Sequence, residues 1–161
     1  MAIDRETVST DLAENKTGGP PQKKKALRRF SYTTLVLLAI ALFFFFNFHT
    51  VVVSGQSMEP TFHTGERLLA CKAYWLVGPI RDKDVVVIQR PGEYIIKRVY
   101  KTAGETVDFV NAPANWDISQ GEYKVPAGCV YVLGDNRPVS SDSRVFGAVQ
   151  ASNVIGKILR L

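Results

Sequence analysis

The feature that most constrains this chain is an unbroken run of 19 uncharged residues at positions 30–48, rich in leucine and phenylalanine. As a helix this run would be about 29 Å long, which matches the hydrocarbon core of a bilayer. A basic cluster precedes it, which predicts a cytoplasmic N-terminus and an external C-terminus: Lys23, Lys24, Lys25, Arg28 and Arg29. We therefore expect a single-pass membrane helix over 30–48, located in the plasma (inner) membrane.

A cleaved secretory signal peptide is the alternative interpretation of the same run. It would also have a basic segment, then an apolar segment, then small residues such as those of Val52-Val53-Ser54. However, the apolar segment of a signal peptide usually spans about 7–15 residues. The greater length and the phenylalanine content favour a retained anchor.

Charge is distributed unevenly, and this argues against a nucleic-acid partner. The net charge is +5, but residues 1–29 hold seven Lys or Arg against four Asp or Glu, whereas residues 49–161 hold thirteen against eleven. The excess is a cluster beside the apolar run and not a broad basic surface. The polar composition of residues 1–22 predicts that 1–29 form a disordered, basic, cytoplasmic tail.

The few histidines and cysteines exclude several kinds of site. His49 and His63 are the only histidines, so neither a zinc site nor a Ser-His-Asp mechanism is indicated. Cys71 and Cys129 form no Cys-x-x-Cys motif; they are either two buried apolar side chains or, outside the cytoplasm, one disulfide. We expect no metal and no cofactor. Nothing in the sequence indicates an obligate assembly, so we expect a monomer.

After residue 48 the sequence changes to short runs rich in Val, Ile and Tyr, separated by turn residues such as Pro91-Gly92. Residues 49–161 show no sustained helical periodicity and are numerous enough for one domain with a core. We expect a mainly β domain, folded as a compact barrel or sandwich. The expected strands are residues 49–54, 67–73, 84–90, 93–102, 106–111, 129–133 and 154–161. Residues 111–121 are expected to form a surface loop.

Three stretches of this domain carry groups suited to catalysis. Ser57 lies in a turn just after the apolar run. In a strand over 93–102, Lys97 shares a face with two apolar neighbours, Ile95 and Val99. It therefore either reaches water at a sheet edge or is buried, where desolvation lowers its pKa and makes the amine a competent base. Residues 134–144 are either a solvated loop or a charge-braced loop whose serines orient an amine.

Taken in order, these stretches resemble the motifs of type I signal peptidases, the peptidase S26 family. They are Ser57-Met-Glu-Pro-Thr, Lys97-Arg-Val and Gly134-Asp-Asn-Arg-Pro-Val-Ser-Ser-Asp-Ser-Arg144, behind an N-terminal anchor. The resemblance covers most of residues 51–147. It implies that 49–161 form an extracytoplasmic, β-barrel-like serine endopeptidase domain. Such an enzyme removes signal peptides from exported preproteins after Ala-x-Ala, with preproteins and the lipid bilayer as its partners.

The resemblance also implies a role for each matched residue. Ser57 would be the nucleophile and Lys97 the general base, while Ser140 would bind the lysine amine. The Ser57 N–H would be one donor of the oxyanion hole. A supporting salt-bridge network would comprise Asp142, Arg144, Arg98 and Asp135. The substrate cleft would be lined by Met58, Val53, Phe62, Ile95 and Ile96, residue types that are equally typical of an ordinary core.

Two features distinguish this chain from part of that family: Gly55, which other members share, and a short stretch before the third motif. Some members carry a serine two residues before the nucleophile, whose hydroxyl completes the oxyanion hole, whereas this chain has Gly55. The second donor is therefore not identified from the sequence. The stretch between the lysine strand and the third motif is also short, which implies a minimal catalytic core. A Ser-x-x-Lys arrangement is excluded because Pro60 occupies the third position after Ser57.

Two other functions fit parts of the sequence. A Ser-Lys protease dedicated to one task, such as maturation of a pilin in a conjugation system, would carry the same motifs. A catalytically inactive, membrane-anchored β domain that binds partners would need none of the chemistry. The range of preproteins that are cleaved separates a dedicated maturation protease from a general signal peptidase. Cleavage of any preprotein excludes the inactive binding domain.

Overall fold

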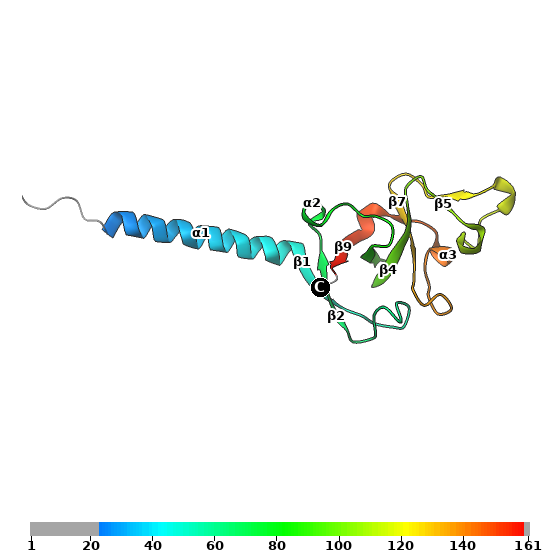
Figure 1. Cartoon of the computed structure of the whole chain (residues 1–161), viewed down its shortest axis with the longest axis horizontal. Helices are drawn as coiled ribbons and strands as arrows, with labels where there is room; N and C mark the ends of the chain where they lie inside the picture. Colours follow the sequence, from blue (N-terminus) through cyan, green and yellow to red (C-terminus); the bar gives the residue numbers. More distant parts are fainter. Residues whose placement is uncertain (1–22, 160–161) are drawn as a thin grey trace, which may run out of the picture. The chain divides into compact units, whose positions relative to one another are not determined.

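The computed structural model describes residues 23–159, with side chains from residue 30 onward. The tail predicted over 1–29 therefore lies mostly outside the described residues. The chain divides into two compact units, residues 1–39 and residues 40–161. The first holds most of the described part of helix α1, and the second holds the end of α1 and every strand (Figure 1).

Helix α1 spans Lys23–Asn47, so it begins within the basic cluster and not at residue 30. Its residues 30–47 are long and apolar enough to cross a membrane, and none of them is buried. The hydroxyls of Thr33 and Thr34 each donate to the Phe30 carbonyl at 2.9 Å, which gives polar groups of an apolar helix an internal partner. Length and composition together suggest a membrane anchor.

The domain after α1 is built on a seven-stranded sheet with the order β1-β2-β9-β3-β4-β7-β8, in which every pair is antiparallel. Pairing runs from β1 at one edge to β8 at the other. The predicted mainly β fold behind one N-terminal apolar helix is confirmed. The strands of this sheet are β1 (Phe48–Val52), β2 (Arg67–Cys71), β3 (Val85–Arg90), β4 (Glu93–Thr102), β7 (Cys129–Leu133), β8 (Val149–Gln150) and β9 (Val154–Leu159).

Strand boundaries follow the sequence pattern where the strands are long. β4 and β7 begin and end as predicted. The predicted strand over 106–111 is instead β5 (Thr106–Val107) followed by the 3-10 turn Phe109–Asn111, because the Asp108 side chain accepts from the Asn111 N–H and caps a turn there. Short elements absent from the prediction are α2 (Tyr74–Val77), 3-10 turns Ile118–Gln120 and Ala151–Asn153, β6 (Tyr123–Lys124), α3 (Ser143–Phe146) and β8.

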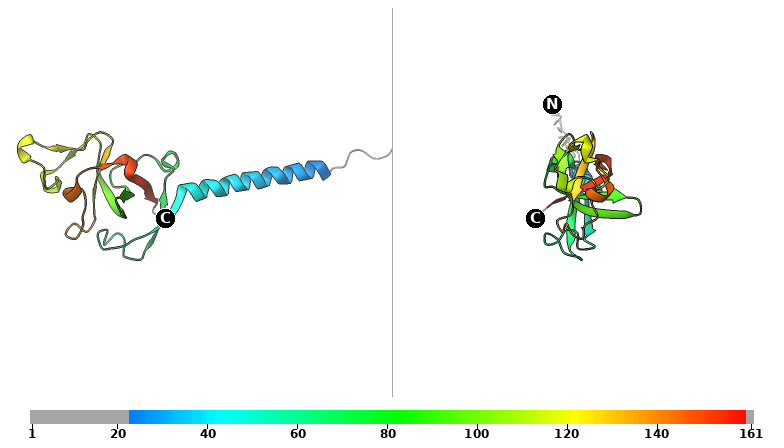
Figure 2. Two further views of the ribbon diagram at one scale, coloured as in Figure 1. Left: turned by 180° about the vertical axis from the view of Figure 1, so that it is seen from behind. Right: turned by 90° about the vertical axis from the view of Figure 1, so that its right-hand side faces the viewer.

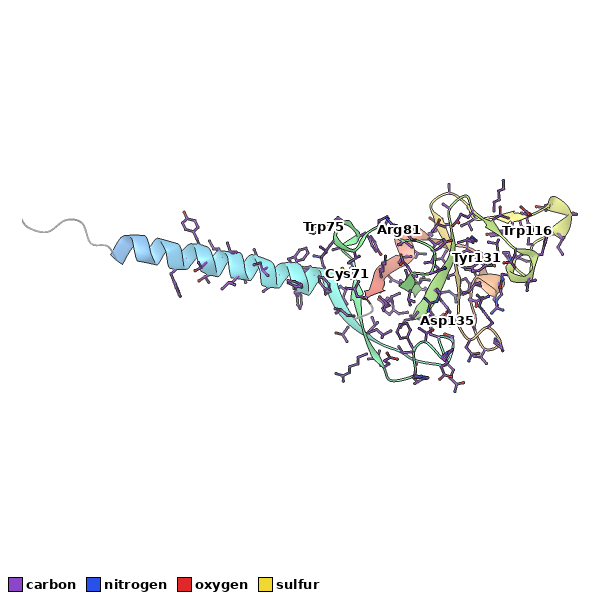
Figure 3. The ribbon with its side chains drawn as sticks, viewed as in Figure 1. Cys71, Trp75, Arg81, Trp116, Tyr131 and Asp135 are labelled. Carbon is purple, nitrogen blue, oxygen red and sulfur yellow. The ribbon has the colours of Figure 1, made fainter. Side chains whose placement is uncertain are left out.

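β5 and β6 pair with each other in a second, two-stranded sheet, within a lobe formed by residues 105–125. This lobe extends beyond one end of the main sheet, as Figure 1 and the left view of Figure 2 show. Its ring contacts run from Trp116 through Tyr123 to Tyr131 of β7, with centroid separations of 5.0 and 5.6 Å. Trp116 and Tyr131 are labelled in Figure 3. The surface loop predicted over 111–121 is the outer part of this lobe.

Three apolar clusters form the core of the domain. One joins β1, β2, β3 and β9 to the segment after β1, a second lies over β3, β4, β7 and β9, and a third lies between β7 and the lobe. Ile96 packs on the first cluster and Ile95 on the second, as the predicted alternation of β4 requires. Cys71 and Cys129 are both buried free thiols.

Candidate active site

Lys97 is fixed in the middle of β4 by strand pairing and burial. It stands opposite Val86 in the register of β3 and β4, and only 4% of its surface is exposed. Val99, two residues along on the same face, is also buried. Of the two alternatives left open by the sequence, burial is the one observed.

The Lys97 amine lies 2.6 Å from the Ser57 hydroxyl oxygen, within hydrogen-bond distance. Burial lowers the pKa of Lys97 from its ordinary value of 10.5, and this outweighs the charges of Asp142 and Glu93, which raise it. Arg90 adds a smaller lowering effect. The amine is thus held against the hydroxyl in surroundings that favour its neutral form, the form able to accept a proton.

Ser57 is presented by a loop whose two ends are tied together. The Val53 N–H donates to Glu66 O and the Gly65 N–H donates to Val53 O, both at 2.9 Å. Inside the loop, the side chains of Met58 and Phe62 are buried in the first core cluster. These anchors leave Ser57 half-exposed at the surface of the core.

Gly55 has a backbone requirement of its own. Its φ is +89°, a conformation that side-chain-bearing residues rarely adopt. Its carbonyl accepts a hydrogen bond from the Thr64 hydroxyl at 3.1 Å. A glycine at this position therefore follows from the shape of the loop. In the described part of the chain, the Ser57 N–H has no hydrogen-bond partner, so this donor remains available.

The register of β4 and β7 explains why residues 134–144 meet the lysine. Arg98 stands opposite Leu133, the last residue of β7. Gly134 therefore emerges alongside Lys97, and the loop after it passes over the nucleophile turn. The Asn136 N–H donates to the Ser57 carbonyl at 3.0 Å, which joins the two segments through their backbones.

Asp142 is fully buried and anchors this loop from inside. It accepts two hydrogen bonds from the Arg144 guanidinium, at 2.9 and 3.0 Å, and one from the Gly134 N–H at 3.0 Å. Burial alone would raise the pKa of Asp142, but these hydrogen bonds outweigh it and the pKa is lowered. Arg144 also donates to Arg137 O at 2.7 Å. Ser143 accepts from the Val132 N–H at 3.0 Å, so the loop is also tied to β7.

Arg98 and Asp135 form a second, separate brace. The guanidinium donates to both oxygens of the Asp135 carboxylate, at 2.8 and 2.6 Å, and also to the Lys83 carbonyl at 2.9 Å. The Thr61 hydroxyl donates to the same carboxylate at 2.5 Å. Burial of Asp135 opposes these hydrogen bonds, yet its pKa is lowered. The four charged residues expected to form one network thus form two pairs, with Arg98–Asp135 on the nucleophile turn and Asp142–Arg144 inside the loop.

Ser140 is close to the dyad but does not make the expected contact. Its hydroxyl is buried and has no hydrogen-bond partner among the described residues, so the bond expected with Lys97 is not formed here. The hydroxyl does lie near enough to Asp142 to help lower the pKa of that carboxyl. Gly134 packs directly against Ser140: a Cβ built on Gly134 would lie 2.1 Å from the Ser140 Oγ.

A cleft of about 290 Å³ opens beside Ser57 and Lys97. One wall consists of residues 52–54 with 57–58, and the other consists of residues 93–97 of β4. Val53, Met58, Ile95 and Ile96 therefore line the cleft as expected. Phe62 does not: it is buried behind the nucleophile turn and lines a different cavity, next to β2.

Sequence reasoning assigned no role to several residues that this site uses. Thr61 and Gly134 belong to the quoted motifs, but their contacts depend on how two distant loops meet. Glu93 and Tyr94 line the far end of the cleft because β4 continues past Lys97 to a hairpin turn. The available signal was the strand period, which places Glu93 on the same face as Ile95 and Lys97.

A serine hydroxyl against a buried amine, on an antiparallel β domain, is an arrangement suited to a serine protease that uses no histidine. The family model for "signal peptidase, peptidase S26" matches residues 26–114 and 112–160. The chain therefore belongs to the peptidase S26 family of signal peptidases. Its activity is that of a signal peptidase I.

Individual relatives agree with the family match. The signal peptidase I of Bacillus caldolyticus is 31% identical over 85% of this chain and 91% of its own length. The probable signal peptidase I-1 of a Synechocystis strain is 33% identical over 66% of this chain and 67% of its own length. A crystal structure of a signal peptidase I from Enterococcus faecalis has 28% identity and a TM-score of 0.40, covering 51% of this chain and 97% of that one.

Proposed function

We propose that Ser57 is the nucleophile and Lys97 the general base of this endopeptidase. The observation that carries the proposal is the 2.6 Å approach of the buried Lys97 amine to the Ser57 hydroxyl inside one cleft. With the amine neutral, the Ser57 hydroxyl donates to its lone pair. The nucleophile is thereby activated without a histidine.

The reaction then proceeds in two balanced halves. The Ser57 oxygen attacks the carbonyl carbon of the scissile peptide while its proton passes to Lys97. The lysine ammonium returns that proton to the leaving amine as the C–N bond breaks, which leaves an ester on Ser57. Water attacks the ester, gives one proton to Lys97 and releases the carboxylic acid, and the ammonium finally reprotonates Ser57. The Ser57 N–H, which has no partner among the described residues, would donate to the developing oxyanion.

The remaining site residues position this dyad. Asp142 with Arg144 and Arg98 with Asp135 hold the loop and the nucleophile turn in place through bidentate pairs. We infer that Ser140, which packs against Gly134 beside the nucleophile turn, orients the lysine amine when substrate is bound. Because apo active sites often show loose contacts that tighten in the complex, its lack of a partner here is compatible with that role.

Substrate binds in an extended form between the two walls of the cleft. Within the described residues, positions 93–97 of β4 pair with β3 on one side only, because β7 begins to pair at Arg98. This free edge can accept the main chain of a preprotein. The apolar side chains of Val53, Ile95 and Ile96 in the cleft lining would favour small apolar substrate side chains, such as those of an Ala-x-Ala site.

The anchor at residues 30–48 would place the domain of residues 49–161 on the external membrane surface, with residues 1–29 in the cytoplasm. A Val110→Cys variant tests this orientation, since Val110 is 89% exposed while both native cysteines are buried. A membrane-impermeant maleimide should label it in intact cells. Labelling only after the membrane is opened would show that residues 49–161 lie in the cytoplasm and would contradict the proposed orientation.

Variants of the dyad test the catalytic assignment. Ser57→Ala and Lys97→Ala should each abolish cleavage of an Ala-x-Ala preprotein while the thermal unfolding transition remains cooperative. Cleavage at the wild-type rate by either variant would refute the dyad. Incubation with several unrelated preproteins separates a general signal peptidase, which cuts most of them, from a dedicated maturation protease, which cuts one.

A further inference from the structure

The far end of the cleft carries a carboxylate that the catalytic proposal does not use. Glu93 is the first residue of β4 and lines the same cleft as Ser57 and Lys97. It is the only acidic residue in the lining of that cleft. Four residues of extended strand separate it from Lys97, or about 13 Å.

The contacts of Glu93 leave part of its carboxylate available. Its Oε1 accepts from Arg90 Nη1 at 3.2 Å, whereas Oε2 has no partner in the described part of the chain. The Arg90 guanidinium also lies 4.1 Å from the centre of the Phe146 ring and is absent from the cleft lining. Arg90 is thus held against Phe146, outside the cleft lining, and the negative charge of Glu93 is the one that a ligand at this end of the cleft meets.

An extended substrate on the free edge of β4 advances one residue for each strand residue it passes. We take the substrate to run parallel to β4, so the substrate residue beside Glu93 lies about four positions upstream of the one beside Lys97. That residue belongs to the part of the signal peptide just before the small-residue cleavage motif. A basic side chain there would gain an ion pair with Glu93, and an acidic one would meet a like charge.

We propose that Glu93 is a specificity-determining residue that selects basic over acidic side chains at the fourth to sixth positions before the scissile bond. This inference rests on the proposed function, because it takes the substrate to lie along residues 93–97. Glu93 is 55% exposed at its side chain, so the effect is a modest preference that salt can screen.

The test uses the full-length protein in detergent and three sets of peptides with an Ala-x-Ala site. Each set carries Lys, Gln or Glu at one position, the fourth, fifth or sixth before the cut. At low salt, the wild type should cleave the Lys peptide with a kcat/KM about three- to tenfold above the Glu peptide at one position of the three. In 1 M salt this ratio should fall toward one, since the Debye length is then about 3 Å.

Charge variants at Glu93 decide the matter. Glu93→Gln should bring the Lys-to-Glu ratio toward one, and Glu93→Lys should invert it. Glu122→Lys, the same charge change on the exposed lobe outside the cleft lining, should keep the wild-type ratio. Arg90→Gln should increase the preference for the Lys peptide, because it removes the cation that now binds Glu93 Oε1.

The inference is overturned if Glu93→Lys keeps the wild-type Lys-to-Glu ratio at all three positions, or if Glu122→Lys changes that ratio as much. These outcomes are distinguishable from failure of the proposed function. If the proposed function is wrong, Ser57→Ala or Lys97→Ala will still cleave the Gln peptides, whatever the charge preference.

Discussion

Replacing Gly134 by alanine perturbs the dyad with a single methyl group. The added Cβ would lie 2.1 Å from Ser140 Oγ, 2.5 Å from Ser140 Cβ and 2.6 Å from the Ser57 carbonyl oxygen. Ordinary carbon contacts begin at about 3.4 Å, so each neighbour must retreat by roughly 1 Å. Ser140 can rotate its side chain away, but the Ser57 carbonyl is backbone and is also bound by the Asn136 N–H at 3.0 Å.

Two effects of different size should follow in Gly134→Ala. Overpacking of a filled site costs about 1–3 kcal/mol, which lowers the unfolding midpoint by several degrees. A displacement of the nucleophile by about 1 Å costs on the order of 100-fold in kcat. Thermal unfolding of the full chain and peptide cleavage under saturating substrate measure the two separately.

Two further variants separate these effects. Ser140→Gly removes both contacts with Ser140 but keeps the 2.6 Å contact with Ser57 O. The Gly134→Ala/Ser140→Gly double variant should therefore regain stability, yet remain about 100-fold below Ser140→Gly alone in kcat. Gly156→Ala is the matched control: its Cβ meets Ala70 at 3.1 Å in another part of the sheet, so kcat should not change. A Gly134→Ala enzyme with wild-type kcat would refute the argument.

Further predictions concern the buried polar groups of the site. Lys97→Met should abolish activity and raise stability by about 1 kcal/mol, because the folded state no longer desolvates an amine; a lower unfolding midpoint would contradict this. Asp142→Asn should cost about 3 kcal/mol at neutral pH, since it leaves Arg144 without its buried partner, as measured by denaturant unfolding. Because folding lowers the pKa of Asp142, its stabilising contribution is present above the ordinary value of 3.8 and is lost as the pH falls through the folded-state pKa, so wild type and Asp142→Asn should converge in acid. Ser140→Ala should leave the unfolding midpoint within about a degree, because the hydroxyl makes no hydrogen bond of normal geometry within the described residues, whereas kcat should fall because Ser140 is proposed to orient the amine.

The sequence predicted those parts of the site that depend on local periodicity. The alternation of β4 places Ile95, Lys97 and Val99 on one face. The apolar neighbours left two alternatives open for Lys97, a position at a sheet edge that reaches water and burial, and only the structure shows that it is buried. The long strands were recognisable for the same reason. β5, β6 and β8 have two residues each, which is too short for a period to appear.

Contacts between loops that are distant in the sequence could not be predicted from strand periodicity. One network of four charged residues was expected, but Arg98 and Arg144 take separate carboxylates because residues 134–144 place Asp135 over the nucleophile turn and Asp142 inside the loop. Phe62 follows the nucleophile by five residues and was expected in the cleft. The loop after Ser57 turns its ring into the core instead. Chain-local patterns carry no information on either arrangement.

The pH dependence of kcat/KM on a neutral peptide tests the central claim most directly. Protonated Lys97 has no lone pair to accept the Ser57 proton, so activity should fall as the pH drops below the pKa of Lys97. Since burial lowers that pKa from 10.5, the midpoint of the acid limb should lie below this value. The limb should be unchanged in a His49→Gln/His63→Gln variant, which removes the only histidines. A rate that stays constant into acid, or a limb that disappears with the histidines, would contradict a lysine base.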